Sequence, residues 1–218
     1  MLGRLTDLQA RILVALAPVQ PRWTLTGGAA LAGFHLQHRT TRDLDLFWHG
    51  LAVFGPEPEQ CIDHLEREGL TVNVLQRTTG FVRLRAELHG EAAVVDLVAE
   101  PVPNIERPQQ VTAGGAMIQV DSLYEILVNK LGTLLHRAEV RDLVDLRALL
   151  DRGGDLGRAL RDANKKDSGF SPIMLGHLLH GFPLERQAKI AGLDAATTAA
   201  LDRFRVDLAA RIAKVTQP

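Results

Sequence analysis

Two aspartates separated by one residue, Asp43 and Asp45, form the pattern in this sequence that points most directly to chemistry. They begin the run 43–48, in which acidic and apolar residues alternate before the run becomes apolar. In a β-strand, side chains two residues apart point to the same face, about 6.5–7 Å apart along the chain. Carboxylates on one face suit oxygen-preferring cations such as Mg²⁺, and a pair of such ions can support an in-line phosphoryl displacement. The spacing therefore predicts a metal site, and exposed charges at a strand edge are the alternative.

A third carboxylate, Asp96, lies within the apolar run 92–98. Burying a lone carboxylate among apolar residues is costly unless it is paired or binds a cation. We therefore expect Asp96 to share the metal site with Asp43 and Asp45. The alternative is an aspartate at the solvent-exposed end of a strand.

The pair Gly27-Gly28 separates a short strand-like run, 23–26, from a run of small residues, 29–36, that is typical of a helix. A strand that breaks at two glycines and continues as a helix presents free backbone N–H groups, and glycine lets a phosphate approach closely. The spacing is neither the dinucleotide-binding nor the Walker A pattern. The alternative to a phosphate-binding turn is a plain turn.

Lys130 is the only lysine before Lys165 in a chain that otherwise uses arginine. A compact ammonium group suits a triphosphate as a point charge, and the alternative is a solvated helix lysine. Asp142 and Asp145 lie one helical turn apart, so both can face one side of a helix. For the neighbouring arginines 137 and 141, a salt-bridge ladder within the helix is as plausible as a catalytic role.

The elements that must position these residues divide the chain into two parts. Up to residue 120, hydrophobic periodicity predicts helices over 4–18, 29–36 and 57–68, strands over 23–26, 43–48, 70–76, 81–88 and 92–98, and a hairpin over 111–120. The rest is helical in pattern, over 121–150, 155–164, 171–180, 184–191 and 195–215. These patterns predict the α+β class, with a mixed sheet domain over residues 1–120 and a helical domain over residues 121–218.

Composition narrows the functional classes. The chain has 218 residues, of which 46% are hydrophobic and 23% charged, as in ordinary globular proteins. A net charge of −1 excludes charge-driven attraction of the whole molecule to nucleic acid or an anionic membrane, so an RNA contact needs a local basic patch. The single cysteine, Cys61, cannot form an internal disulfide. The apolar run 12–19 is too short to cross a bilayer, so we expect a cytoplasmic protein without a membrane partner.

Two distant motifs carry a resemblance to a known family. The segment Thr26-Gly27-Gly28-Ala29-Ala30-Leu31-Ala32, followed by 38–47 with its Asp-x-Asp pair, resembles the AbiEii-type branch of the polymerase-β-like nucleotidyltransferases. The helical stretch 130–146 is similar to the Lys…Arg…Arg-Asp-x-x-Asp motif of that branch. The resemblance covers about residues 23–150 and is specific because two separate motifs agree in order.

The resemblance implies a nucleotidyltransferase mixed sheet with flanking helices, and a C-terminal helical domain that completes the active-site cleft. It implies transfer of a nucleoside monophosphate from an NTP to a hydroxyl, with release of pyrophosphate and with Mg²⁺ or Mn²⁺ as cofactor. The expected partners are the NTP, an RNA or tRNA acceptor and an antitoxin protein. The implied metal ligands are Asp43, Asp45 and Asp96. The implied catalytic residues are Asp43, Asp45, Asp96, Lys130 and Asp145. The implied nucleotide-binding residues are Thr26, Gly27, Gly28, Arg39, Arg42, Lys130 and Asp142.

Two other readings of the same residues remain open. The first is a nucleotidyltransferase that modifies a small molecule or a protein hydroxyl, and a screen of acceptors distinguishes it. The second is a catalytically silent module that keeps the fold and binds a nucleotide or a partner. The presence of Asp43, Asp45, Asp96 and Lys130 argues against the silent module.

Overall fold

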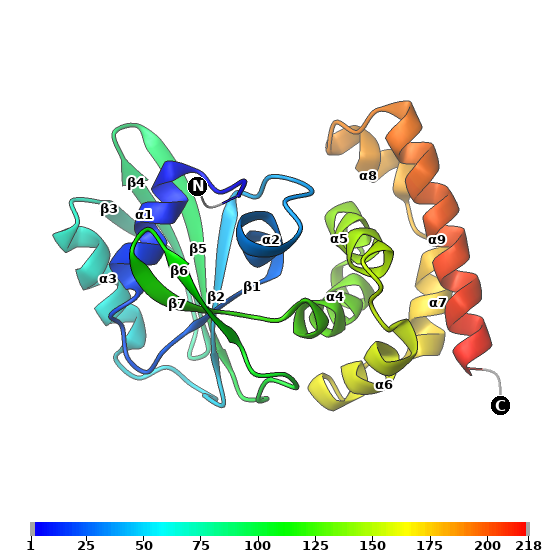
Figure 1. Cartoon of the computed structure of the whole chain (residues 1–218), viewed down its shortest axis with the longest axis horizontal. Coiled ribbons are helices and arrows are strands. Elements are labelled where there is room, and N and C mark those ends of the chain that lie inside the picture. The colour runs from blue at the N-terminus through cyan, green and yellow to red at the C-terminus, as the bar shows by residue number, and fades with distance from the viewer. Residues whose placement is uncertain (1–2, 217–218) are drawn as a thin grey trace. The chain divides into compact units, whose positions relative to one another are not determined.

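The chain forms a sheet unit and a helical unit. The computed structural model describes residues 3–216, and these divide into one compact unit that ends at Ser122 and another that begins at Leu123. The first contains a mixed sheet with helices, and the second contains helices (Figure 1). The α+β class predicted from the sequence is confirmed.

The sheet of the first unit has seven strands within the described residues, in the order β3-β4-β5-β2-β1-β7-β6. Strand β2 is central, pairing antiparallel with β1 and parallel with β5, while β4 pairs antiparallel with β5. The strand bounds are β1 Thr24–Thr26, β2 Asp43–His49, β3 Thr71–Arg77, β4 Phe81–Leu88, β5 Glu91–Glu100, β6 Gln109–Ala113 and β7 Ala116–Val120.

Alternation along β2 fixes which face carries the acidic side chains. Leu44, Leu46 and Trp48 are fully or almost fully buried, whereas Asp43 and Asp45 are half-buried. Because successive side chains of a strand point to opposite faces, the apolar residues hold both carboxylates on the other face. Two helices, α1 Asp7–Leu16 and α3 Glu57–Arg67, pack against each other beside the sheet (Figure 1).

The glycine pair leads into an irregular helix. Helix α2 spans only Gly27–Ala30 and continues as a π-helical turn, η1, over Leu31–His35. The backbone N–H groups of residues 36 and 37 both donate to the carbonyl of Leu31, at 2.8 and 3.0 Å. The helix predicted over 29–36 is therefore present, but it begins two residues earlier and changes its hydrogen-bonding pattern. π-helical turns of this kind occur frequently at functional sites.

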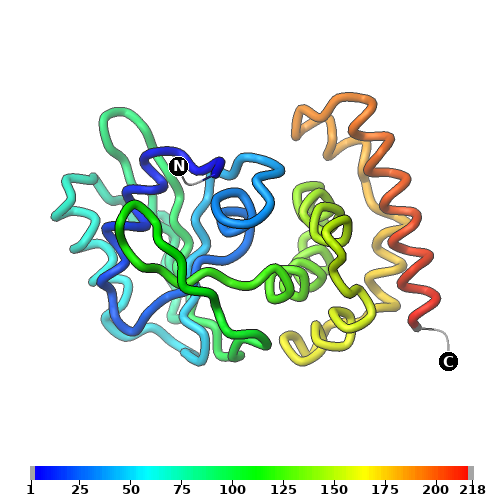
Figure 2. The backbone as a smooth tube through the Cα atoms, in the orientation of Figure 1, coloured from blue at the N-terminus to red at the C-terminus, as the bar shows by residue number. Residues whose placement is uncertain are grey.

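The helical unit is arranged around α4, which packs against α5, α6 and α7. Its longest helix, α9, lies alongside α7, as the orange-to-red end of the tube shows in Figure 2. A buried ion pair joins α4 to α6, where Lys166 Nζ lies 2.6 Å from Glu125 Oε1. The bounds are α4 Leu123–Arg137, α5 Val140–Asp151, α6 Leu156–Lys166, α7 Pro172–His180, α8 Leu184–Ile190 and α9 Ala195–Thr216. Among residues 3–216, no helix has both the length and the apolar character needed to cross a membrane.

Candidate active site

Four residues on four adjacent strands form a row on one face of the sheet. Strand pairing places Thr26 of β1 opposite Asp45 of β2, and Asp45 opposite Asp96 of β5. Asp96 in turn lies opposite Arg83 of β4. Residues directly opposite each other in neighbouring strands point their side chains to the same face, and Asp43 lies two residues before Asp45 on that face. We call this set, Thr26, Asp45, Asp96 and Arg83, the site row.

The glycine turn, Gly27-Gly28, follows Thr26 at the end of the site row and lies close to the carboxylate of Asp45. Gly27 has a φ of +61°, a left-handed conformation that glycine adopts at little cost. A Cβ at this position would lie only 2.5 Å from Asp45 Oδ2, so the carboxylate fills the space that a side chain would take. A Cβ on Gly28 would lie 2.8 Å from Arg39 Nη2. Both glycines therefore let charged groups approach the backbone, with the anion at Gly27 and the cation at Gly28.

Thr26 completes this corner of the site. Its hydroxyl oxygen is buried and makes no hydrogen bond to any residue in the described part of the chain, 3–216. Buried polar atoms are nearly always paired, so an unpaired hydroxyl beside a glycine turn is suited to a polar ligand. The corner thus combines a hydrogen-bonding side chain with backbone that a ligand can approach closely.

A pocket of about 320 Å³ opens beside Asp43. Asp43 lies in its wall together with Arg42 and Arg85, and Thr41, Gln9 and Thr6 add polar groups. Gln9 Nε2 donates to the carbonyl of Thr41 at 3.1 Å, which fixes α1 to the segment that precedes β2. Arg42, predicted to bind nucleotide, therefore lines a cavity next to Asp43.

Asp96 forms a two-point ion pair with Arg83. Arg83 Nε lies 2.7 Å from Asp96 Oδ1, and Nη2 lies 2.6 Å from Oδ2. Hydrogen bonding to Asp96 raises the pKa of Arg83, and the charges of Asp96, Asp43 and Asp45 add to this effect. Within residues 3–216, no group of three or more His, Cys, Asp or Glu side chains is arranged to hold a metal ion. The structure thus brings Asp96 beside Asp45 but gives it a cationic partner.

Arg83 was not among the residues predicted from the sequence, although a signal for it exists. A two-residue turn at His89-Gly90 sets Leu88 opposite Glu91. Counting outward from this turn pairs Arg83 with Asp96, as the structure has it. The register of a hairpin follows from its turn, so the partner of Asp96 could have been found by locating the turn.

The second predicted group, in the helical unit, is a buried cluster of charges. Lys130 Nζ lies 2.8 Å from Asp142 Oδ1 and 2.7 Å from Asp145 Oδ2. Arg137 joins Asp142 through Nε at 2.7 Å and Nη2 at 2.8 Å. Both aspartates are fully buried, and the side chain of Lys130 is 6% exposed. This burial excludes the alternative that Lys130 is a solvated lysine on a helix surface.

Asp142 remains a carboxylate because cations surround it. Burial by itself raises the pKa of Asp142, but hydrogen bonds from Arg137 and the charge of Lys130 outweigh burial, and the pKa falls below its ordinary value. Arg141, in contrast, forms an exposed ion pair with Glu139. Arg141 thus makes a salt bridge to the residue that precedes α5, whereas Arg137 belongs to the buried cluster.

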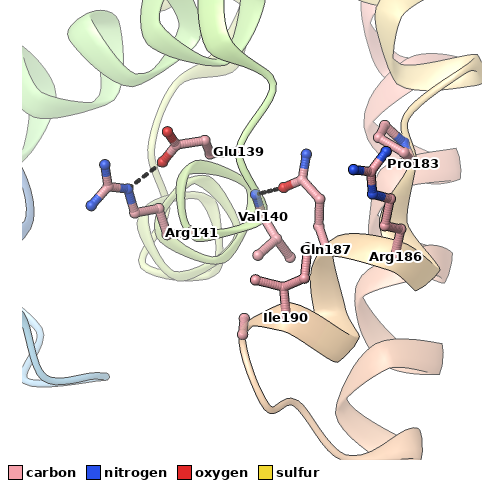
Figure 3. Close-up of a pocket in the computed structure, with 8 residues that line it drawn as sticks. Glu139, Val140, Arg141, Pro183, Arg186, Gln187 and Ile190 are labelled. Carbon is pink, nitrogen blue, oxygen red and sulfur yellow. Dashed lines mark hydrogen bonds and ion pairs between the residues drawn. The ribbon is translucent and has the colours of Figure 1, made fainter.

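A larger pocket, of about 500 Å³, lies in the helical unit between the start of α5 and α8. Figure 3 shows Gln187 reaching from α8 to Val140, whose backbone N–H donates to Gln187 Oε1 at 2.6 Å. Its described lining residues include none of the predicted metal ligands, catalytic residues or nucleotide-binding residues. Size alone therefore does not identify the candidate site, which we place at the site row and the glycine turn.

Comparison with known proteins identifies the family and the fold. A family model described as nucleotidyl transferase AbiEii toxin, type IV TA system, matches residues 11–214. A candidate nucleotidyltransferase from Helicobacter pylori is similar in fold, with 16% identity, coverage of 98% of this chain and 100% of that chain, and a TM-score of 0.53. JHP933 from Helicobacter pylori is 15% identical, with coverage of 96% and 95% and a TM-score of 0.53. No curated protein sequence matches the chain.

The sheet, the glycine turn and these likenesses define the fold as that of a nucleotidyltransferase. Within this class, the chain belongs to the AbiEii nucleotidyltransferase toxin family of type IV toxin–antitoxin systems. The resemblance seen in the two sequence motifs is thereby confirmed, and the protein is a nucleotidyltransferase.

Proposed function

We propose that the protein transfers a nucleoside monophosphate from an NTP to a hydroxyl of an RNA acceptor, with tRNA the first candidate. In this reaction the acceptor oxygen forms a bond to the α-phosphorus, and the bond from that phosphorus to the bridging oxygen breaks. Pyrophosphate leaves with the electron pair, and the hydroxyl proton passes to solvent. Membership of the family supports the reaction class.

The contact between Gly27 and Asp45 carries the assignment of the site. Asp45 Oδ2 lies where a side chain at position 27 would be, so the turn and the carboxylate form one continuous surface. A triphosphate at the turn would lie beside backbone N–H groups, the hydroxyl of Thr26 and the guanidinium of Arg39. These groups would hold the leaving pyrophosphate and orient the α-phosphate for attack.

Asp43 and Asp45 fit a divalent cation. Both lie on the same face of β2, and Mg²⁺ in nucleotide sites is usually bound by one or two carboxylates together with substrate phosphates. When bound, Mg²⁺ or Mn²⁺ would supply positive charge to the phosphate oxygens. The two-carboxylate set is sufficient for such binding, and Asp96 is paired with Arg83.

The pocket beside Asp43 offers the guanidinium groups of Arg42 and Arg85 to an RNA phosphate, and Glu87 pairs with Arg85. Arg42 and Arg85 both line it, within a cavity that also contains Asp43. A local basic patch is what a nearly neutral protein needs in order to bind RNA, since phosphate contacts supply most of the affinity. We therefore place at this pocket the RNA phosphodiester that adjoins the acceptor hydroxyl.

We also infer that the protein acts in the cytoplasm, with an antitoxin protein as its partner.

A labelling experiment tests the reaction and the acceptor together. Each of the four NTPs, labelled at the α-phosphate or at the γ-phosphate, is incubated with the protein, Mg²⁺ and total tRNA, total protein or a set of small hydroxyl compounds. We expect α-label on RNA, no γ-label on any acceptor, and loss of the signal on addition of EDTA. Transfer of γ-label would contradict nucleotidyl transfer. If α-label appeared only on protein or on a small compound, the acceptor would be that molecule and not RNA.

A further inference from the structure

Arg83 is the cationic member of the site row. Its guanidinium engages Asp96 through Nε and Nη2 at 2.7 and 2.6 Å. An arginine has five N–H donors, so this pairing uses one edge of the fork and leaves Nη1 and the second Nη2 hydrogen. Among the described residues, Asp96 is its only hydrogen-bonding partner, and the side chain is 42% exposed.

The position of Arg83 relative to the other carboxylates is also defined. The register places Arg83, Asp96 and Asp45 side by side on β4, β5 and β2. The charges of Asp43 and Asp45 both contribute to the raised pKa of Arg83, so the guanidinium lies within the electrostatic field of the Asp-x-Asp pair. The Phe81 ring lies under the guanidinium, with Cζ 5.6 Å from the ring centroid.

Asp96 fits the role of a support better than that of a metal ligand. It is 7% exposed, and both of its oxygens already accept hydrogen bonds from a fully charged group. A buried carboxylate held in this way is neutralised by its partner, and separating the two would leave a charge without compensation. A guanidinium fork held along one edge by a carboxylate presents its other edge in a fixed orientation, a geometry that matches phosphate oxygens.

We propose that Arg83 is a nucleotide-binding residue whose outer edge contacts the triphosphate, and that Asp96 is the positioning residue that holds it there. This inference rests on the proposed function. In that site the arginine stabilises negative charge on the phosphates during transfer, a role that fixed cations fill in phosphoryl-transfer enzymes. The site then has two strand carboxylates for a metal and one strand arginine for phosphate.

Binding of inorganic tripolyphosphate by the whole protein, measured by calorimetry in EDTA, tests the role of Arg83 without metal or catalysis. We expect Arg83→Gln to weaken binding by about ten- to a hundredfold, the range for loss of a hydrogen bond to a charged group. Arg83→Lys should lie between wild type and Arg83→Gln. The matched control is Arg77→Gln, which removes an exposed arginine on β3 of the same sheet that pairs with Glu59 on α3. The tripolyphosphate affinity of this control should match that of wild type.

A double variant separates loss of the cation from damage to the fold. Arg83→Gln alone leaves a buried carboxylate without its partner, whereas Arg83→Gln with Asp96→Asn pairs two neutral amides. The double variant should regain thermal stability while keeping the weak tripolyphosphate affinity. Affinity of the double variant equal to that of wild type would overturn the proposal, as would retention of wild-type affinity by a folded Arg83→Gln.

Binding of Mn²⁺ in the absence of nucleotide, followed by electron paramagnetic resonance, tests the role of Asp96. Asp96→Asn should bind Mn²⁺ within about threefold of wild type and bind tripolyphosphate more weakly. If Asp96 were a metal ligand, Asp96→Asn would lose Mn²⁺ affinity by about tenfold or more, which would overturn the proposal. Failure of the proposed function looks different, because wild type itself would then transfer no label and Asp45→Asn would change nothing.

Discussion

At the scale of single residues, the site depends on a carboxylate placed where a glycine has no side chain. Asp45 Oδ2 would lie 2.5 Å from a Cβ at Gly27, a separation that no alanine could keep. The sequence pattern indicated both the glycine pair and the Asp-x-Asp pair, because each is a local motif. It could not indicate that the two are in contact, since this contact depends on the pairing of β1 with β2.

Gly27→Ala should therefore impair activity more than it impairs stability. Alanine in a left-handed conformation costs about 1–2 kcal/mol, and the displaced carboxylate should lower kcat by about a hundredfold, as small misplacements of reacting groups do. The control is Gly69→Ala, with a φ of +83° and nothing within 4 Å of the added Cβ, which should lose similar stability and keep its activity. Equal activity losses in the two variants would show that the strain alone is responsible.

Lys130 offers a second prediction at this scale, because Lys166 is a matched control. Both ammonium groups are nearly buried and lie against buried carboxylates, Lys130 against Asp142 and Asp145 and Lys166 against Glu125. Replacing either by methionine breaks a buried ion pair, so each should lose about 3–5 kcal/mol of unfolding free energy.

If Lys130 also acts on the nucleotide, as the resemblance implies, only Lys130→Met should lose transfer activity when both variants are assayed well below their melting temperatures. Urea unfolding supplies the stabilities and label transfer supplies the activities. Parallel activity in the two variants would limit Lys130 to a structural role.

At the scale of elements, local periodicity accounted for most of the strands and helices, and tertiary effects accounted for what it missed. The strand predicted over 81–88 is β4 with the same bounds. The π-helical turn η1 was not predicted, because the sequence pattern of small residues does not distinguish its hydrogen bonds from those of an α-helix. The burial of Lys130 was also left open, since it depends on α4 packing against α5.

The connection from α4 to α5 carries a prediction about acid stability. The pKa of Asp142 is lower in the folded protein than its value of about 3.9 in an unfolded chain. The ionised carboxylate therefore stabilises the fold fully at pH values above that unfolded pKa. That stabilisation is lost as the pH falls through the folded pKa, which lies lower still. Without the guanidinium of Arg137, less positive charge opposes the effect of burial on the pKa of Asp142, and protonation begins at a higher pH.

Arg137→Gln should therefore unfold at a higher pH than wild type in an acid titration followed by circular dichroism. At neutral pH the variant should also lose unfolding free energy, because one of the cations around a buried carboxylate is missing. Coincident acid transitions for the two proteins would contradict the role given to Arg137.

At the scale of the whole molecule, the two units contribute charge in different ways. The sheet unit gathers Asp43, Asp45, Asp96 and Arg83 on one face, while the helical unit buries Lys130 between two carboxylates. The fold class and the family were predictable because they depend on the order of elements and on two motifs. The pairing of Asp96 with Arg83 was not recognised from the sequence, although the register that follows from the turn at His89-Gly90 gives it.

Membership of a toxin family gives a prediction for the intact protein in cells. Induced expression of wild type in a bacterial host should slow growth, because the proposed function transfers nucleotides onto cellular RNA and removes that RNA from use. Asp45→Asn, expressed to the same level, should leave growth unchanged. Equal growth inhibition by the two proteins would show that the effect does not come from the site row.

The rate of label transfer by Asp45→Asn, compared with wild type and with Asp63→Asn, tests the central assignment most directly. Asp63 is an exposed acid that pairs with Arg67 on α3, so its amide variant controls for the loss of one negative charge. We predict that Asp45→Asn loses about a hundred- to a thousandfold in kcat/KM while Asp63→Asn matches wild type, the range for loss of one charge-stabilising group. Transfer by folded Asp45→Asn at the wild-type rate would contradict the site described here.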